Sequence, residues 1–119
     1  MVKTAIVTTG DGRIVCERCL IADGPVARMR GLLGRKELPS GEGILLKPSG
    51  SVHTFFMRFP IDVVFLDREL RVVAIAPDVP PWRMRGARGA KAVVELTAGE
   101  ASRRGLTEGQ TLVVSEPPK

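Results

Sequence analysis

Short apolar runs separated by turn residues recur along the whole chain. Such runs, with Gly, Pro, Asp or Ser between them, are typical of β-strands joined by tight turns. They predict strands at residues 4–9, 13–22, 53–58, 61–66, 70–76, 91–96 and 111–115, with a further short apolar run at 44–46. The pattern predicts a mainly β fold, an antiparallel β-sandwich or flattened barrel of about six to seven strands with one or two short helices.

Two hairpins follow from turn residues placed between consecutive strands. Gly10, Asp11 and Gly12 separate the first two predicted strands, and residues 67–69 begin with Asp67, a favoured first residue of a turn. We therefore expect each of these strand pairs to be antiparallel.

Two short stretches depart from the strand pattern. From Pro25, apolar residues recur at helical spacing until Gly34, which predicts a helix of about three turns. Thr97 and Glu100 form a capping-box pattern that predicts a second helix, ended by Gly105.

The densest stretch is 53–67, which holds the only histidine and all four phenylalanines. If 53–58 is extended, His53 and Met57 share one face, while Arg58 lies on the other. Pro60 should break the ladder before a second strand in which Asp62 falls among apolar residues. A buried carboxylate needs donors or a cation. We therefore favour a structural Asp62, bonded to backbone amides or to Arg58, over a catalytic one.

Three stretches together resemble the family named domain of unknown function 192. They are HTFFMRFPIDVVFLD at 53–67, ARMRGLLGR at 27–35 and AVVELTAGEASRRGLTEGQTLVV at 92–114. Leu70 stands where a turn glycine is common in that family. The resemblance implies a small, mostly β domain with a short helix or two and no established activity.

Cys16 and Cys19 form a CxxC within a predicted strand. On a continuous strand a separation of three residues places two thiols on opposite faces, so we favour buried structural cysteines over a metal or redox pair. The chain holds no second CxxC and no paired histidines, so no metal site and no cofactor are predicted. A turn at Glu17 and Arg18 would instead let both cysteines approach His53.

Residues 77–90 show neither helical nor alternating periodicity and predict a long surface loop. Trp82 lies there beside several arginines, an arrangement that suits stacking on a base or an aromatic ligand. The alternative, which we favour, is that Trp82 covers the open end of the core.

A chain of 119 residues with a net charge of +5 predicts one basic domain, residues 1–115, followed by a flexible tail at 116–119. Excess positive charge permits weak binding of anions without specifying one. The N-terminus lacks the apolar stretch of a signal peptide, and no run is long enough to span a bilayer. We expect a cytoplasmic protein without a membrane partner.

These observations favour a binding module for a small anionic ligand. The candidate ligand-binding residues are His53, Met57, Arg58, Asp62 and Trp82, which we expect to line one pocket. The first alternative is an enzyme in which His53 acts as a base or metal ligand and Asp62 orients it. Weak nucleic-acid binding through the basic surface ranks last, because the chain has few aromatic residues, and the oligomeric state is left open.

Overall fold

The computed structural model describes residues 3–24, 32 and 34–116. Its elements are β1 (Lys3–Thr9), β2 (Ile14–Ala22), β3 (Glu42–Leu46), β4 (Ser51–His53), β5 (Ile61–Leu66), β6 (Val72–Val79), β7 (Met84–Gly86), β8 (Ala92–Thr97), α2 (Glu100–Arg103) and β9 (Leu112–Ser115). The helix predicted from Pro25 lies almost entirely outside the described residues. No helix among the described residues is long and apolar enough to cross a membrane.

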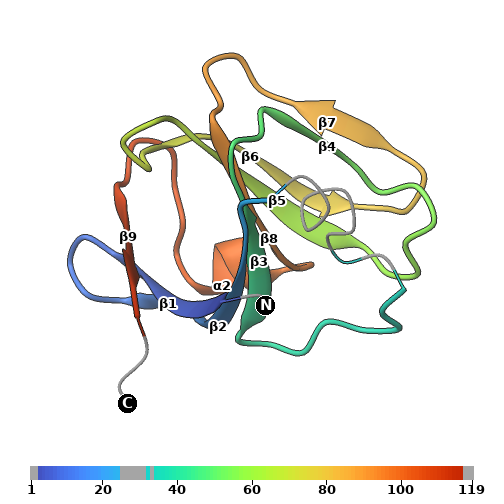
Figure 1. Ribbon diagram of the computed structural model, residues 1–119, viewed down its shortest axis with the longest axis horizontal. Helices are drawn as coiled ribbons and strands as arrows, with labels where there is room; N and C mark the ends of the chain where they lie inside the picture. The colour runs from blue at the N-terminus through green and yellow to red at the C-terminus, as the bar shows by residue number, and fades with distance from the viewer. Residues whose placement is uncertain (1–2, 25–31, 33, 117–119) are drawn as a thin grey trace.

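Seven strands form one curled sheet in the order β6-β5-β8-β3-β2-β1-β9 (Figure 1). The predicted mainly β fold and both predicted hairpins are confirmed. The sheet departs from the antiparallel expectation at one pair, since β2 and β3 are parallel. Residues 23–41 connect these two strands, and a crossover of that length can return the chain in the same direction.

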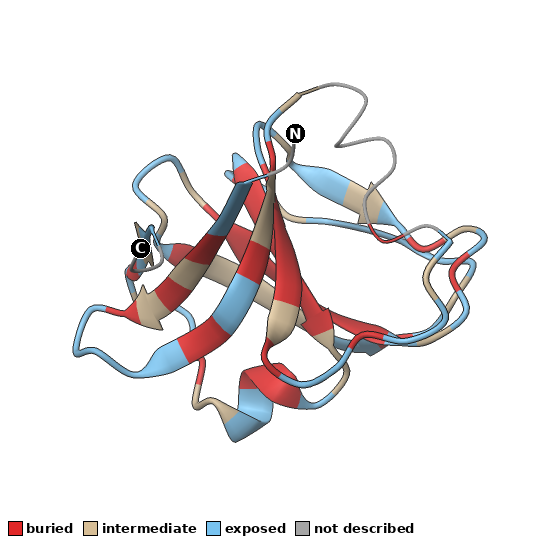
Figure 2. Ribbon diagram, turned by 60° about the horizontal axis from the view of Figure 1, so that its bottom comes forward, coloured by how far each residue is buried: buried red, intermediate tan, exposed pale blue. Residues whose placement is uncertain are grey.

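The curled sheet is pinned at one end, where an antiparallel bridge joins Arg71 to Thr111. The Leu112 amide also donates to the Leu70 carbonyl at 2.8 Å, which draws β9 towards the start of β6. One apolar cluster fills the concave side of the curl and includes Val7, Val64, Val94 and Leu96. The sheet is therefore a half-barrel, and Figure 2 shows buried residues along all of its central strands.

A second apolar cluster covers the convex side of β3, β5 and β8. Ile61, Val63 and Phe65 of β5 belong to it, whereas Val64 and Leu66 belong to the concave cluster. The predicted alternation along β5 is thus confirmed. Because both faces of this strand are covered, all of its residues are buried.

A separate two-stranded ribbon, β4 paired with β7, lies apart from the large sheet at the top of Figure 1. Its register places Ser51 opposite Gly86 and His53 opposite Met84. Two expectations are therefore wrong. The strand predicted for 53–58 stops at His53, and the stretch 77–90 is no continuous loop, because it holds the end of β6 and all of β7.

The turn after β5 explains a departure from the family pattern noted above. The Asp67 carboxylate accepts the amides of Glu69 and Arg71, both at 2.9 Å. Leu70 then adopts a φ of 64°, a left-handed conformation that glycine adopts without strain. Leucine is held there by the hydrogen bonds around it and by packing on the concave cluster.

Candidate functional site

Four rings gather at the end of the β4–β7 ribbon where His53 pairs with Met84. His53 stacks on Phe55 with 5.0 Å between ring centroids, and Phe55 stacks on Trp82 at 5.9 Å. Phe56 tilts against Trp82 at 4.7 Å. Phe56 is 70% exposed and Trp82 is 56% exposed. We call these four residues the aromatic platform.

Buried Thr54 holds the two loops of the platform together. Its hydroxyl donates to the Pro80 carbonyl at 2.7 Å and accepts the Arg83 amide at 2.9 Å. Its own amide donates to the Arg83 carbonyl at 2.8 Å, and its carbonyl accepts the Trp82 amide at 3.0 Å. One small side chain on the first loop therefore fixes the second loop, and with it the position of Trp82.

The two most exposed rings stand on strained backbone. Phe56 has a φ of 67° and Trp82 a φ of 68°. Non-glycine residues seldom adopt this left-handed region, and bulky ones there cost roughly 1 to 3 kcal/mol each. The hydrogen bonds of Thr54 keep both residues in this conformation. The rings are consequently held in water, where burial offsets little of that cost.

Of the residues expected to line one pocket, the structure brings His53 and Trp82 together through Phe55. Arg58 is exposed on the same loop, two residues after Phe56. Met57 instead packs in the convex cluster and is 7% exposed. The favoured expectation that Trp82 covers the end of the core does not fit its exposure. A role for any of these residues in ligand binding stays a prediction.

Asp62 is the remaining predicted residue, and it is 1% exposed. Its carboxylate accepts the amide of Asp78 at 2.8 Å, that of Gly99 at 3.1 Å and that of Ala101 at 2.8 Å. We call Asp62 and these three amides the α2 junction. The preferred structural reading, a carboxylate bonded to backbone amides, fits this geometry, although the amides come from β6 and α2 and not from the bend at Pro60.

The predicted capping box of Thr97 and Glu100 is wrong. Helix α2 begins after Gly99, which has a φ of 92°, and no side chain of its own segment caps it. The orphan amides at a helix N-terminus need acceptors, and a carboxylate is the best of them. Here the acceptor is Asp62, 37 residues before Gly99, which leaves Thr97 without the expected role.

Glu100, the other half of the predicted box, forms a different network. It is buried and receives hydrogen bonds from Ser40 and from Arg104, the latter at 2.9 Å. Arg104 also binds Glu17 at 2.7 Å and so ties α2 to β2. Burial raises the pKa of the Glu100 carboxyl, but these donors outweigh it and leave the pKa below its ordinary value. The carboxylate is thus held ionised in a structural role.

The chain is similar to a known protein family over most of its length. Residues 5–114 match the family model DUF192, described as an uncharacterized ACR. The chain belongs to the DUF192 family. It is 38% identical over 69 residues to the UPF0127 protein PH1112 of Pyrococcus horikoshii, a match that covers 54% of this chain and 57% of that protein. The matched stretch therefore spans a little over half of the curated relative.

Two solved structures resemble the whole DUF192 chain. A protein of unknown function from Novosphingobium aromaticivorans aligns with a TM-score of 0.80 and 26% identity, over 94% of this chain and 84% of that one. A Sinorhizobium meliloti protein, described as a candidate transcription regulator, aligns with a TM-score of 0.82 over 96% of this chain and 94% of that one. Its identity is 21%, so this likeness shows the fold alone. The family is uncharacterised, and no activity comes with it.

Sequence reasoning on this DUF192 chain missed Glu95. It lies in the middle of β8, opposite Ile44 of β3 and Val63 of β5, and is 4% exposed. Burial raises the pKa of its carboxyl to about 7. The carboxyls of Asp62 and Glu100 accept hydrogen bonds, whereas the Glu95 carboxyl accepts none from another described residue. Its position among apolar residues of a central strand was the signal that could have singled it out.

The cysteines of the DUF192 chain lie on one face, not on opposite faces. In the pairing with β1, Cys16 lies opposite Val7 and Cys19 opposite Ala5, so β2 holds one extra residue there. Such a β-bulge brings both side chains into the concave cluster, where both are free and buried. A hydrogen bond between the thiols lowers the pKa of Cys16 and raises that of Cys19. Among the described residues, no three His, Cys, Asp or Glu side chains gather as metal ligands.

Proposed function

We propose that this domain is a binding module for a small planar anion, which stacks on the aromatic platform. The observation that carries the proposal is the exposure of Phe56 and Trp82 on left-handed backbone. Exposed aromatic carbon and strained φ values both oppose folding, so the fold alone does not account for them. A flat ligand that covers the rings would gain the burial that the free protein lacks.

The arginines around the platform supply the charge. Arg58 and Arg83 are exposed, and neither forms an ion pair with a described residue. Arg83 donates to the Trp82 carbonyl at 3.3 Å. Each guanidinium has five N–H donors, so donors remain for a carboxylate or phosphate.

The geometry favours binding over catalysis at this place. His53 Nδ1 accepts the Phe55 amide at 3.3 Å, and the Asp62 carboxylate accepts the amides of the α2 junction. Within the described residues no hydrogen bond links the two side chains. The pairing of base and orienting carboxylate that an enzyme would need is therefore not supported, and a stacking site is the better candidate.

Trp82 makes the proposal directly testable, because the chain has one tryptophan and no tyrosine. Its fluorescence, excited at a wavelength that adenine does not absorb, should be quenched saturably by adenosine monophosphate. Adenosine, which lacks the charge, should bind at least tenfold more weakly, and inorganic phosphate should leave the emission unchanged. Phe56→Ala and Arg83→Ala should each weaken the quenching, whereas Arg88→Ala, a matched exposed arginine outside the platform, should not.

Three results would overturn the proposal. The first is the absence of saturable quenching of Trp82 fluorescence by adenosine monophosphate. The second is equal affinity for adenosine, which would remove the role of the arginines. The third is affinity that grows with oligonucleotide length and falls steeply with salt, which would indicate single-stranded nucleic acid instead of a small molecule.

A further inference from the structure

The open end of the half-barrel holds two adjoining hollows, of about 550 and about 560 Å³. Asp23 and Lys47 line both of them, so the two hollows lie on either side of a shared boundary, and we call the pair the mouth. Small-molecule sites usually have volumes of about 300 to 1,000 Å³ and often lie at the mouths of β-barrels. None of the five residues predicted from the sequence lines the mouth.

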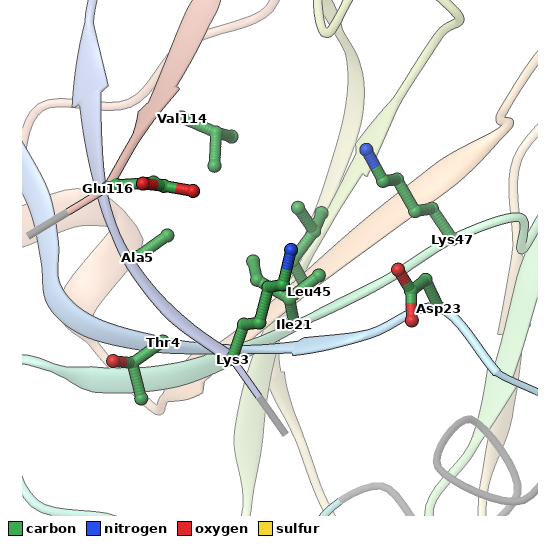
Figure 3. A pocket seen from close by; sticks show the side chains of 9 residues that line it. All are labelled: Lys3, Thr4, Ala5, Ile21, Asp23, Leu45, Lys47, Val114 and Glu116. Atoms are coloured by element: carbon green, nitrogen blue, oxygen red, sulfur yellow. The ribbon is translucent and has the colours of Figure 1, made fainter. Parts of the chain in front are cut away.

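The floor of the mouth is apolar. It consists of Ala5, Ile21, Leu45 and Val114, which extend the concave cluster to its open end. In Figure 3, Ile21 and Leu45 lie at the centre, with charged side chains around them. Ile21 and Val114 are only partly buried. The described residues therefore leave the interior of the curl incompletely covered at this end.

Strand alternation places charges at the rim. Lys3, Asp23 and Lys47 are each two residues from a floor residue, namely Ala5, Ile21 and Leu45. Lys3 begins β1, whereas Asp23 and Lys47 each lie one residue past the end of β2 and β3. Residues two apart along extended backbone share a face, so these charged side chains continue the concave face outward. Glu116 follows Val114 in the same way at the end of β9. The apolar floor thus ends in a ring of charged groups.

Cations outnumber free carboxylates in the mouth. Lys3, Lys47, Lys91 and Arg68 line it, and none forms an ion pair with a described residue. Of the three carboxylates that line it, Asp67 already accepts two backbone amides. Asp23 and Glu116 remain, against four cations. The rim therefore favours an anionic group over a cationic one.

We infer that the mouth binds an amphipathic anion, with its apolar chain on the floor and its acidic head at Lys47. Lys47 is the cation that both hollows share, so a head group there can be reached from either side. A carboxylate or a sulfonate on an aliphatic chain has this chemistry. The site is separate from the aromatic platform, because the residues of the two do not overlap.

Calorimetric titration with decanoate, below its micelle concentration, tests the inference on the full chain. Decanoate should bind saturably, whereas decyltrimethylammonium, with the same chain and the opposite charge, should bind at least tenfold more weakly. Lys47→Glu should weaken decanoate binding at least tenfold. Lys36→Glu makes the same charge change at an exposed residue outside the mouth and should bind as the wild type does.

Trp82 fluorescence separates this result from the proposed function. Decanoate that occupies the mouth should leave the emission of Trp82 unchanged, and adenosine monophosphate should still quench it in the Lys47→Glu protein. Absence of binding heat, equal binding of the cationic detergent, or an unchanged affinity in Lys47→Glu would each overturn the inference. Lys47 is exposed, so its substitution should not prevent folding.

Discussion

The α2 junction and the aromatic platform reverse the usual distribution of polar and apolar groups in opposite ways. The junction buries a carboxylate, and the platform exposes two large rings. Every oxygen of Asp62 has an amide donor, so its burial is explained by the fold. The exposed rings contact only part of one another's surface, and their backbone is strained. A buried carboxylate whose oxygens all accept hydrogen bonds is explained by a structural role. Exposed rings on strained backbone have no such explanation, and they indicate a binding surface.

Glu95 belongs with neither region. It is as deeply placed as Asp62, yet no described residue donates to it, and its raised pKa reflects burial alone. A buried carboxyl without donors is most stable when it is protonated. The energetic difference between Asp62 and Glu95 should therefore appear in stability measurements, both in size and in pH dependence.

The largest effect should come from Asp62→Asn. The substitution replaces one acceptor oxygen by an NH₂ group that faces backbone amides, so buried donors lose their partner. We expect a loss of about 3 to 4 kcal/mol in the free energy of unfolding, measured by urea denaturation. Asp23→Asn makes the same change at an exposed residue outside the junction and should cost less than about 0.5 kcal/mol. Equal losses in both variants would mean that the α2 junction contributes little.

The pH dependence of unfolding should isolate Glu95. Its pKa is about 7 in the folded chain and 4.5 as an ordinary glutamate, so the folded state holds the proton more tightly. The contribution of Glu95 to the free energy of unfolding is then fully present below pH 4.5, and it is lost as the pH rises towards 7 and beyond. The loss should reach about 3 kcal/mol. Unfolding of Glu95→Gln should lack this decline, and parallel pH profiles for the two proteins would contradict it.

Thr54→Val should affect the platform and stability together. Valine keeps the shape but leaves the Arg83 amide without the hydroxyl that accepts it. We expect a loss of about 2 kcal/mol in the free energy of unfolding and a red shift of Trp82 emission, as the second loop loosens. Thr8→Val, at a β1 threonine outside the platform, should leave the emission unchanged. An unshifted spectrum in Thr54→Val would show that other contacts position the ring.

The smallest change in stability should follow Phe56→Gly. Glycine relieves the left-handed strain and adds backbone entropy to the unfolded chain, so the unfolding free energy should stay within about 1 kcal/mol of the wild type. Phe65→Ala removes a buried ring and should cost about 3 to 5 kcal/mol. Quenching by adenosine monophosphate should be lost in Phe56→Gly. A large destabilisation of Phe56→Gly would mean that the ring serves the fold.

Sequence patterns predicted the strands whose neighbours are close along the chain. Alternation along β5 and the turn residues at 10–12 and 67–69 depend on local preferences, which the structure follows. The anomalous position of Asp62 was also visible. Its donors were not, because Gly99 and Ala101 are 37 and 39 residues away and are brought close only by the sheet order.

The candidate site was less predictable. β4 and β7 have three residues each, which is too short for an alternation of apolar and polar residues to be recognised. The strand pairing that positions His53 therefore could not be predicted from the sequence. The left-handed backbone at Phe56 lies in a local turn, closed by the Met57 amide, which donates to the Thr54 carbonyl at 3.2 Å. Trp82 is held in the same conformation by a loop that Thr54 binds through Pro80 and Arg83, which lie 26 and 29 positions away. Glu95 stands among buried residues of a strand with a sheet neighbour on each side, and this central position in the sheet, unlike its apolar neighbours, is not visible in the sequence.

The bridge between Arg71 and Thr111 has a consequence for self-association. The border strands of an open sheet carry unpaired backbone groups that can recruit a strand from another copy and start polymerisation. Near this bridge the amides and carbonyls of the two borders already pair with each other. Strand addition by a second copy is therefore blocked at that end of the borders and confined to the opposite one.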